Sequence, residues 1–137
     1  MEPISIAATS LGIAAAVAKT CDVIYDFSRD FKEAADDLSA VTEQIKALDA
    51  ILDPLKRHYS HASTSPLPEH LRKLLEPCLA NCARGVTRIE DTVMKYHHDK
   101  TWSKLKWTQY GQKDLKKLTD SLETHMSILE LGLNLII

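Results

Sequence analysis

The strongest hydrophobic periodicity lies in residues 31–59, FKEAADDLSAVTEQIKALDAILDPLKRHY. Apolar side chains recur there at alternating steps of three and four residues, which is typical of one face of an amphipathic helix. They are Phe31, Ala34, Leu38, Val41, Ile45, Leu48, Leu52, Leu55 and Tyr59. Pro54 lies within the pattern but lacks the amide hydrogen that a helix interior needs. We therefore expect a kink or an early end of this helix near Asp53.

The same periodicity continues on both sides of this stretch. An earlier helix begins near Pro3, and its boundary with the next falls between residues 28 and 36. It carries Ile13, Val17, Ile24, Phe27 and Phe31. A third helix, with a bend expected at Pro77, ends around residues 97–100 and carries Leu71, Leu75, Cys78, Cys82, Val86, Ile89, Val93 and Tyr96. A last helix carries Leu115, Leu118, Leu122, Met126, Leu129, Leu133 and Ile136.

Residues 61–68, HASTSPLP, are small and polar and contain prolines, so they predict a loop. Four long helices, one long loop and no alternating strand pattern predict an all-α fold, an antiparallel four-helix bundle. The length of 137 residues fits a single domain spanning residues 1–137. Because the chain stops inside an apolar helical pattern, we expect it to be the first domain of a longer polypeptide or to continue into a linker.

Charge and cysteine content limit the class of protein. The formal net charge of −2 gives no reason to expect a nucleic-acid partner. Three cysteines, an odd number, without a secretory signal indicate a reducing compartment, and we expect the cytoplasm. The sixteen uncharged residues from Pro3 to Ala18 would span roughly 24 Å as a helix, short of the roughly 30 Å hydrocarbon core. We therefore expect no constitutive transmembrane helix, although a conditional one stays possible.

No enzymatic signature is present, and we expect no cofactor, no metal site and no catalytic residues. Phosphate-binding glycine loops, H-E-x-x-H and G-x-S-x-G are all missing from the sequence. Cys78 and Cys82 lie on one helical face and would suit a metal together with a histidine, but core packing is the preferred interpretation. For the histidines near the loop and at the end of the third helix, solvated positions are preferred to a pH sensor or metal site. They are His58, His61, His70, His97 and His98.

The first helix holds one candidate site. Small residues recur there at every fourth position, as Ala8, Gly12 and Ala16, and we call this small-xxx-small repeat the small-residue file. Such a repeat lets helix backbones approach closely, either in a membrane or in the core of a soluble bundle. The soluble-core interpretation is preferred, and the membrane interpretation stays open. The candidate residues of this helix are Ile4, Ile6, Ala8, Leu11, Gly12, Ile13, Ala16 and Val17.

A basic and aromatic segment from Lys95 to Lys117 is the second candidate site. It has a net charge of +5 from seven lysines and two aspartates, interleaved with tryptophan and tyrosine. Such residues suit the headgroup zone of an anionic membrane. The preferred interpretation is an exposed turn whose tryptophans cap one end of the bundle while the lysines form a solvated face, and the membrane interpretation stays open. The candidate residues are Lys100, Trp102, Lys104, Lys106, Trp107, Lys113, Lys116 and Lys117.

Several stretches together resemble the fungal amino-terminal domain of STAND receptors, the HeLo-like family. They are the opening MEPISIAATSLGIAAAVAKTCDVIYDF, residues 38–55, LLEPCLANC and the ending KLKWTQYGQKDLKKLTDSLETHMSILELGLNLI. The most specific parts are the start, with Pro3, Ile6, Ala7 and Gly12, and the segment from Trp107 to Lys113. The likeness covers almost the whole chain.

The resemblance implies a non-enzymatic effector domain at the front of an NLR-like intracellular immune receptor, followed by a nucleotide-binding module and a repeat sensor. It is similar to the four-helix domain of the animal necroptosis executioner pseudokinase, and related bundles carry out regulated cell death at the plasma membrane. It implies partners of three kinds: further copies of the chain on activation, anionic membrane lipids, and other domains of the same protein. The membrane-directed first helix of the family maps onto Ile4 to Val17, which Ser5, Thr9 and Ser10 make less hydrophobic. The alternative is an adaptor bundle that oligomerises or restrains its receptor without touching lipid.

Overall fold

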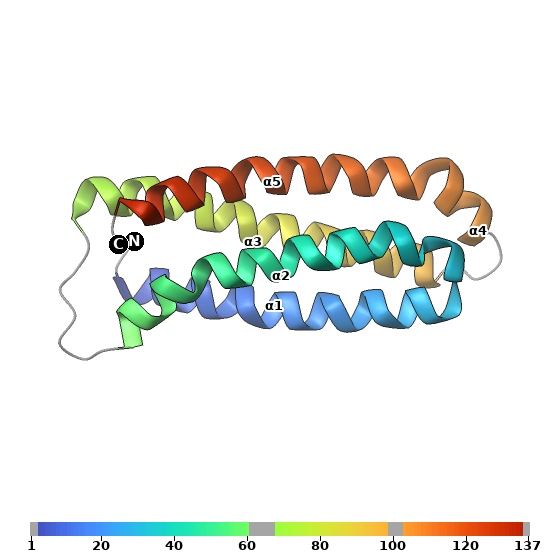
Figure 1. Ribbon diagram of the computed structural model, residues 1–137, viewed down its shortest axis with the longest axis horizontal. Helices are drawn as coiled ribbons and strands as arrows, with labels where there is room; N and C mark the ends of the chain where they lie inside the picture. Colours follow the sequence, from blue (N-terminus) through green and yellow to red (C-terminus); the bar gives the residue numbers. More distant parts are fainter. Residues whose placement is uncertain (1–2, 61–67, 99–102, 136–137) are drawn as a thin grey trace.

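The computed structural model describes residues 3–60, 68–98 and 103–135, except for the side chains of residues 3–5, 7, 58–60, 103 and 104. Helices account for nearly all of the described residues, and no strand occurs among them. In chain order they are α1 (Pro3–Asp30), the 3₁₀ turn η1 (Lys32–Ala34), α2 (Ala35–Ser60), α3 (Glu69–His98), α4 (Ser103–Lys106), the π-helical turn η2 (Trp107–Gly111) and α5 (Gln112–Asn134). The predicted all-α four-helix bundle is confirmed (Figure 1).

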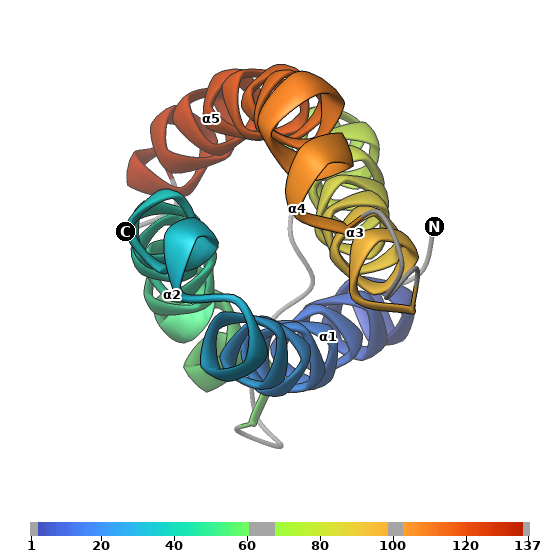
Figure 2. The same ribbon diagram turned by 90° about the vertical axis from the view of Figure 1, so that its right-hand side faces the viewer.

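The helices form a ring in the order α1, α2, α5, α3 when the bundle is viewed along its axis (Figure 2). α1 is antiparallel to α2, and α3 is antiparallel to α5, whereas α1 and α3 run in the same direction (Figure 1). The consecutive helices α2 and α3 therefore lie diagonally opposite each other, and residues 61–67 connect them. Contact is extensive along α1–α2, α1–α3 and α3–α5, and α2 and α5 touch least.

The apolar residues that the periodicity assigns to one face of each helix point into this ring. All their described members are buried except Leu118, which is half-buried against the core. Tyr59 and Ile136 lie outside the described side chains. Three buried apolar residues of the same core lie outside the predicted periodic sets, namely Ile6, Leu79 and Trp107.

The helix boundaries agree with the prediction at most ends. α1 ends at Asp30 and α2 begins at Ala35, inside the predicted interval, and α3 ends at His98. Of the two outcomes expected at Pro54, a kink or an early end, the early end is wrong, because α2 continues to Ser60. The carbonyl that Pro54 leaves unpaired belongs to Ala50, which is exposed, so water can satisfy it.

A bend was also expected at Pro77, through which α3 continues as one helix. The carbonyl that Pro77 frees belongs to the exposed Lys73 and so also faces water. The basic and aromatic segment is not a simple turn either, because residues 103–111 form α4 and η2 and lead directly into α5.

Candidate functional site

The α1 helix buries one face and exposes the other along its amino-terminal half. Ile6, Ile13 and Val17 belong to the buried core, with exposed fractions of 0%, 1% and 5%. Leu11 is 62% exposed and lies on the opposite side. That outer face also contains Ala8, Gly12, Ala15 and Ala18 and carries no charge before Lys19. The side chain of Ile4 lies outside the described residues.

The preferred interpretation of the small-residue file was wrong for two of its three members. Ala8 and Gly12 are exposed, and a Cβ atom added to Gly12 would meet nothing within 4 Å. Only Ala16 packs, half-buried, against the core. The larger residues Ile6 and Ile13 set the rotation of α1 and turn the small file outward. The file is therefore free to meet a helix outside the monomer.

The buried face of α1 carries two hydroxyl groups at 0% exposure, those of Ser10 and Thr20. Ser10 Oγ donates a hydrogen bond to the carbonyl oxygen of Ile6 at 3.0 Å. Thr20 Oγ1 is fully buried and has no hydrogen-bond partner among the described residues. Because a buried unsatisfied polar group costs about 1–3 kcal/mol, Thr20 weakens the attachment of α1 to the bundle.

A buried charge on α3 pairs with Lys19, the residue before Thr20 on α1. Glu90 of α3 is only 7% exposed, and its Oε1 lies 3.1 Å from Nζ of Lys19 on α1. The lysine side chain itself is 70% exposed. Moving α1 away would remove the cation that compensates this buried carboxylate.

Trp107 closes the end of the bundle opposite the amino terminus. Its side chain is 1% exposed, and its ring packs edge-on against Phe27 of α1 at 5.3 Å and Tyr96 of α3 at 5.6 Å between centroids. Its Nε1 donates to Oδ2 of Asp37 on α2 at 3.3 Å. The side chain therefore ties α1, α2 and α3 to the start of α5. The capping role predicted for the tryptophans is confirmed for Trp107, while Trp102 lies outside the described residues.

The π-helical turn η2 leaves no room for a side chain beside this indole. A Cβ atom at Gly111 would lie 2.4 Å from Cε3 of Trp107, so glycine is required there. One turn away, the hydroxyl of Tyr96 donates to Oδ2 of Asp114 at 3.1 Å, and burial, with a smaller contribution from this carboxylate, raises the pKa of Tyr96 to about 12. A membrane-headgroup role for Trp107 is incompatible with this closed conformation.

The described lysines of the candidate patch form a solvated face, as the preferred interpretation predicted. The exposed members are Lys106, Lys113, Lys116 and Lys117. Lys116 Nζ lies 3.5 Å from Oδ2 of Asp120. Among them Tyr110, one of the interleaved tyrosines, is 59% exposed, and Leu105, which the sequence pattern does not single out, is 51% exposed. Lys100 lies outside the described residues, as does the side chain of Lys104.

The cysteines behave as core residues, as predicted. Cys78 and Cys82 are both buried, and burial raises the pKa of Cys82 to about 12, so its thiol stays protonated. Within residues 3–60, 68–98 and 103–135, no group of three metal-ligating side chains comes together.

The histidines are mostly solvated where the structure describes them. His70 and His98 are exposed as expected, whereas His58 and His61 lie outside the described side chains. His97 differs, because its Nε2 lies 3.0 Å from Oδ2 of Asp30 and its ring packs on Phe27. The contact joins the ends of α1 and α3, which the sequence pattern could not show.

None of the helices, over the residues that the structure describes, is both long enough and apolar enough to cross a membrane. No curated protein and no solved structure matches the chain significantly. One protein family does match, described as pigment biosynthesis cluster protein PigL N-terminal, and the match covers residues 1–137. The chain therefore belongs to the PigL N-terminal family.

Proposed function

We propose that the chain is a non-enzymatic effector domain that stores α1 in the bundle at rest. When the attached parts of its receptor cluster it, the domain oligomerises and acts on the plasma membrane in regulated cell death of the heterokaryon-incompatibility type. In this proposal residues 1–137 are the front domain of a fungal NLR-like protein that moves from the cytoplasm to the membrane. Membership of a family of amino-terminal domains and the HeLo-like resemblance both support it.

The observation that carries the proposal is the division of α1 into two dissimilar faces. Its outer face is uncharged from Ala8 to Ala18 and includes Leu11 and Gly12. Its inner face includes the buried hydroxyl of Thr20, which has no described partner. A helix with these two faces is stored imperfectly in water and presents small residues to a neighbouring helix.

The energies involved are small enough for a switch. Burying a side chain such as Ile6, Ile13 or Val17 contributes about 1.5–3 kcal/mol. Lipid is as apolar as the core, so a helix that moves into a bilayer regains most of this energy. The free-energy difference between α1 packed in the bundle and α1 in the bilayer is then a few kcal/mol, which clustering of several copies can supply.

The exposed lysines would strengthen attraction to an anionic membrane. Lys106, Lys113 and Lys117 lie on the outer surface near the start of α5. Each basic residue close to such a surface contributes about 1 kcal/mol, and this attraction is screened by salt. Leu105 and Tyr110 add apolar contact beside them.

A liposome-leakage assay tests the proposal. The domain is fused to an inducible clustering module, and release of dye from anionic vesicles is measured with and without clustering. We expect clustering to cause leakage and Gly12→Leu to reduce it, because leucine blocks close approach between first helices. Gly12→Leu should leave the monomer folded, since nothing lies within 4 Å of its Cβ position.

The matched control is Ala80→Leu, the same enlargement at an exposed position of α3. Leakage should be unchanged in this variant. If neither the clustered wild type nor clustered Gly12→Leu releases dye, the proposed membrane disruption is refuted.

A second function, an adaptor without membrane activity, is favoured by the loose contact between α2 and α5. Two adjoining hollows of about 450 and 430 Å³ lie along this contact. Gln44 Nε2 bridges it by donating to the carbonyl oxygen of Thr119 at 2.8 Å. Light scattering against concentration distinguishes the functions, because an adaptor should self-associate or bind a helical partner without vesicles.

A further inference from the structure

A small hollow lies between α3 and α5, on the side of the molecule away from α2. Its volume is about 90 Å³. Sites for nucleotides and drug-sized ligands usually measure about 300–1,000 Å³, so only a small group fits here. The lining residues are Asn81, Arg84, Gly85, Arg88, Leu118, Ser121, Leu122 and His125. None of them is acidic.

The floor of the hollow is apolar, and its shape depends on Gly85. A Cβ atom at Gly85 would lie 3.1 Å from Cδ1 of Leu122, which is 1% exposed. The absence of a side chain at this position lets α5 approach α3 closely. The polar lining residues then form a rim above a closed floor.

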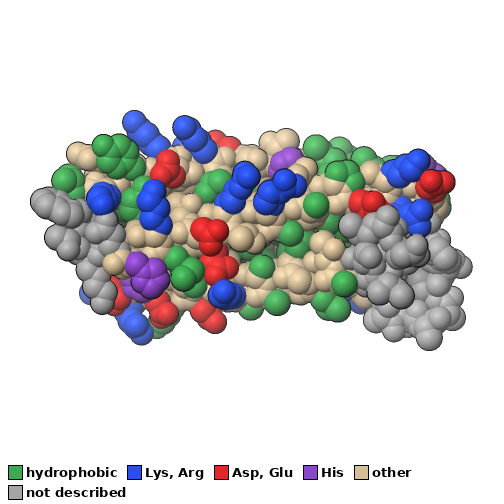
Figure 3. Space-filling model, turned by 180° about the vertical axis from the view of Figure 1, so that it is seen from behind, with side chains coloured by type: hydrophobic (Ala, Val, Ile, Leu, Met, Phe, Trp, Pro, Cys, Tyr) green, Lys and Arg blue, Asp and Glu red, His purple; other side chains and the backbone are tan. Residues whose placement is uncertain are grey.

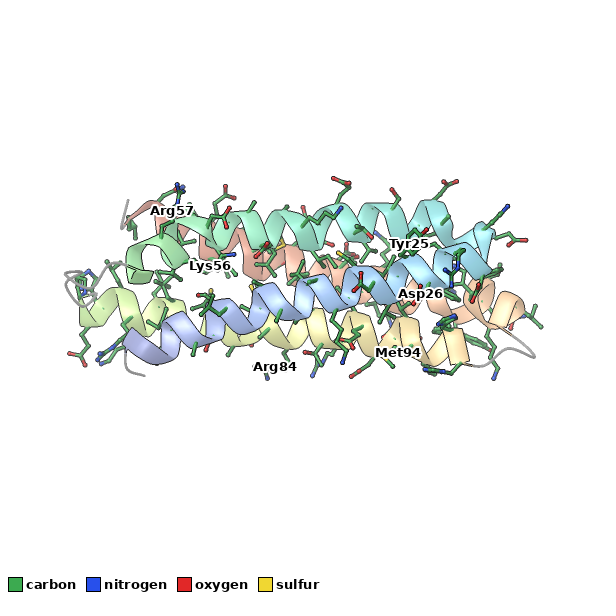
Figure 4. The ribbon with its side chains drawn as sticks, turned by 90° about the horizontal axis from the view of Figure 1, so that it is seen from below. Tyr25, Asp26, Lys56, Arg57, Arg84 and Met94 are labelled. Carbon is green, nitrogen blue, oxygen red and sulfur yellow. The ribbon has the colours of Figure 1, made fainter. Side chains whose placement is uncertain are left out.

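The rim is cationic on the α3 side and offers hydrogen bonds on the α5 side. Arg84 and Arg88 are exposed and lie one helical turn apart. Across the hollow, Ser121 is exposed and His125 is half-buried. Figure 3 shows two basic groups side by side next to a histidine on this face. Figure 4 places Arg84 on the outer side of α3.

Neither guanidinium is neutralised by a carboxylate of the described residues. Arg84 Nη2 donates to Oδ1 of Asn81 at 2.8 Å, a contact that orients the group but leaves its charge. Elsewhere on α3, Arg72 and Lys73 each have an acidic partner on the same helix, at 3.9 and 3.4 Å. Arg84 and Arg88 therefore differ from Arg72 and Lys73, whose charges are compensated by a neighbouring carboxylate.

We propose that this hollow binds a terminal phosphate group, either inorganic phosphate or the phosphate of a monoester. Two guanidinium forks present fixed N–H donors to phosphate oxygens, and the Ser121 hydroxyl and His125 imidazole offer further donors from the opposite helix. The group arrives either as free phosphate or as the headgroup of a phosphoinositide lipid. The inference does not require the membrane activity proposed above, because binding of free phosphate alone would satisfy it.

The experiment titrates the ¹⁵N-labelled domain with inorganic phosphate and follows chemical shifts of its backbone and side-chain nitrogens. We expect shifts centred on Arg84, Arg88 and His125. The double variant Arg84→Gln with Arg88→Gln should weaken binding by roughly tenfold or more, because it removes both charge-assisted forks. The Arg→Lys double variant keeps the charge without the fork and should lose part of the affinity.

The matched control is Lys32→Gln with Lys46→Gln, which removes the same charge from exposed positions in η1 and α2. Thermal unfolding followed by circular dichroism verifies that each variant is folded. Equal weakening in the test and control pairs would overturn the proposal, because it would show a general electrostatic effect. Shifts that are absent, or that are spread over all basic residues, would also overturn it.

A second arm separates the two sources of the phosphate group. Co-sedimentation is measured with phosphatidylcholine vesicles that contain phosphatidylinositol 4-phosphate, and with vesicles that contain phosphatidylserine at equal charge. Selective loss of sedimentation with the first vesicles in the Arg84/Arg88 variant supports the lipid headgroup as the source. Binding of free phosphate without selective sedimentation supports the soluble source.

Discussion

Replacing Thr20 by valine should stabilise the protein. The two side chains are nearly equal in shape, so the change removes a hydroxyl without leaving a cavity. Thr20 Oγ1 is fully buried and has no described partner, and its removal should relieve about 1–2 kcal/mol of the cost of burying it. Valine and threonine have similar helix propensities, so the backbone contribution should stay nearly constant.

Urea unfolding is the direct measurement of this effect. The midpoint should rise by about 0.5–1 M with an unchanged slope, because the surface exposed on unfolding does not change. Heating should show an increase in Tm of about 3–8 °C for a chain of this size. The control is Thr124→Val, whose exposed hydroxyl donates to the carbonyl of Asp120, and its stability should change by less than about 0.5 kcal/mol.

The Thr20→Val variant also tests whether α1 must leave the bundle for activity. If α1 leaves the bundle during activity, Thr20→Val should raise the clustering needed for leakage, because it stabilises the stored form. Amide hydrogen exchange of α1 should slow in parallel. A neutral or destabilising effect of Thr20→Val would refute the reasoning, since it would show that the hydroxyl is satisfied or that it helps to pack α1.

Three further predictions concern the end of the bundle that Trp107 closes and the buried core. Gly111→Ala should destabilise the protein by about 1–3 kcal/mol and change the near-ultraviolet circular dichroism of Trp107, because its Cβ would overlap the indole. The folded-state pKa of Tyr96, about 12, lies above its ordinary value of 10.0, so stability should fall between about pH 10 and 12, and Tyr96→Phe should reduce that loss in unfolding measured against pH. Cys82 should stay unmodified by a thiol reagent in the native protein and react after unfolding, as mass spectrometry would detect.

The periodicity of the apolar residues predicted nearly all of the helical architecture. Each helix must bury one stripe, so steps of three and four residues locate both the helix and its inner face. In α1 the stripe passes through Ile6, Ser10, Ile13, Val17 and Thr20 at these same steps. A strict count of the heptad positions would have indicated that the two hydroxyls are buried. The small file Ala8, Gly12 and Ala16 also repeats every four residues, and only the phase set by the large side chains shows that it faces outward.

Local sequence therefore established the helices, their inner faces and the absence of a recognisable enzymatic motif, because these depend on residues within a few turns. The three-dimensional packing established the order of helices around the ring, the four-helix contact of Trp107 and the missing partner of Thr20. It also brought Arg84 and Arg88 together with His125, which lies far away in the chain. A one-dimensional period fixes how a helix is rotated but not which helix lies beside it or at which register. Contacts between distant residues could therefore be read only from the folded chain.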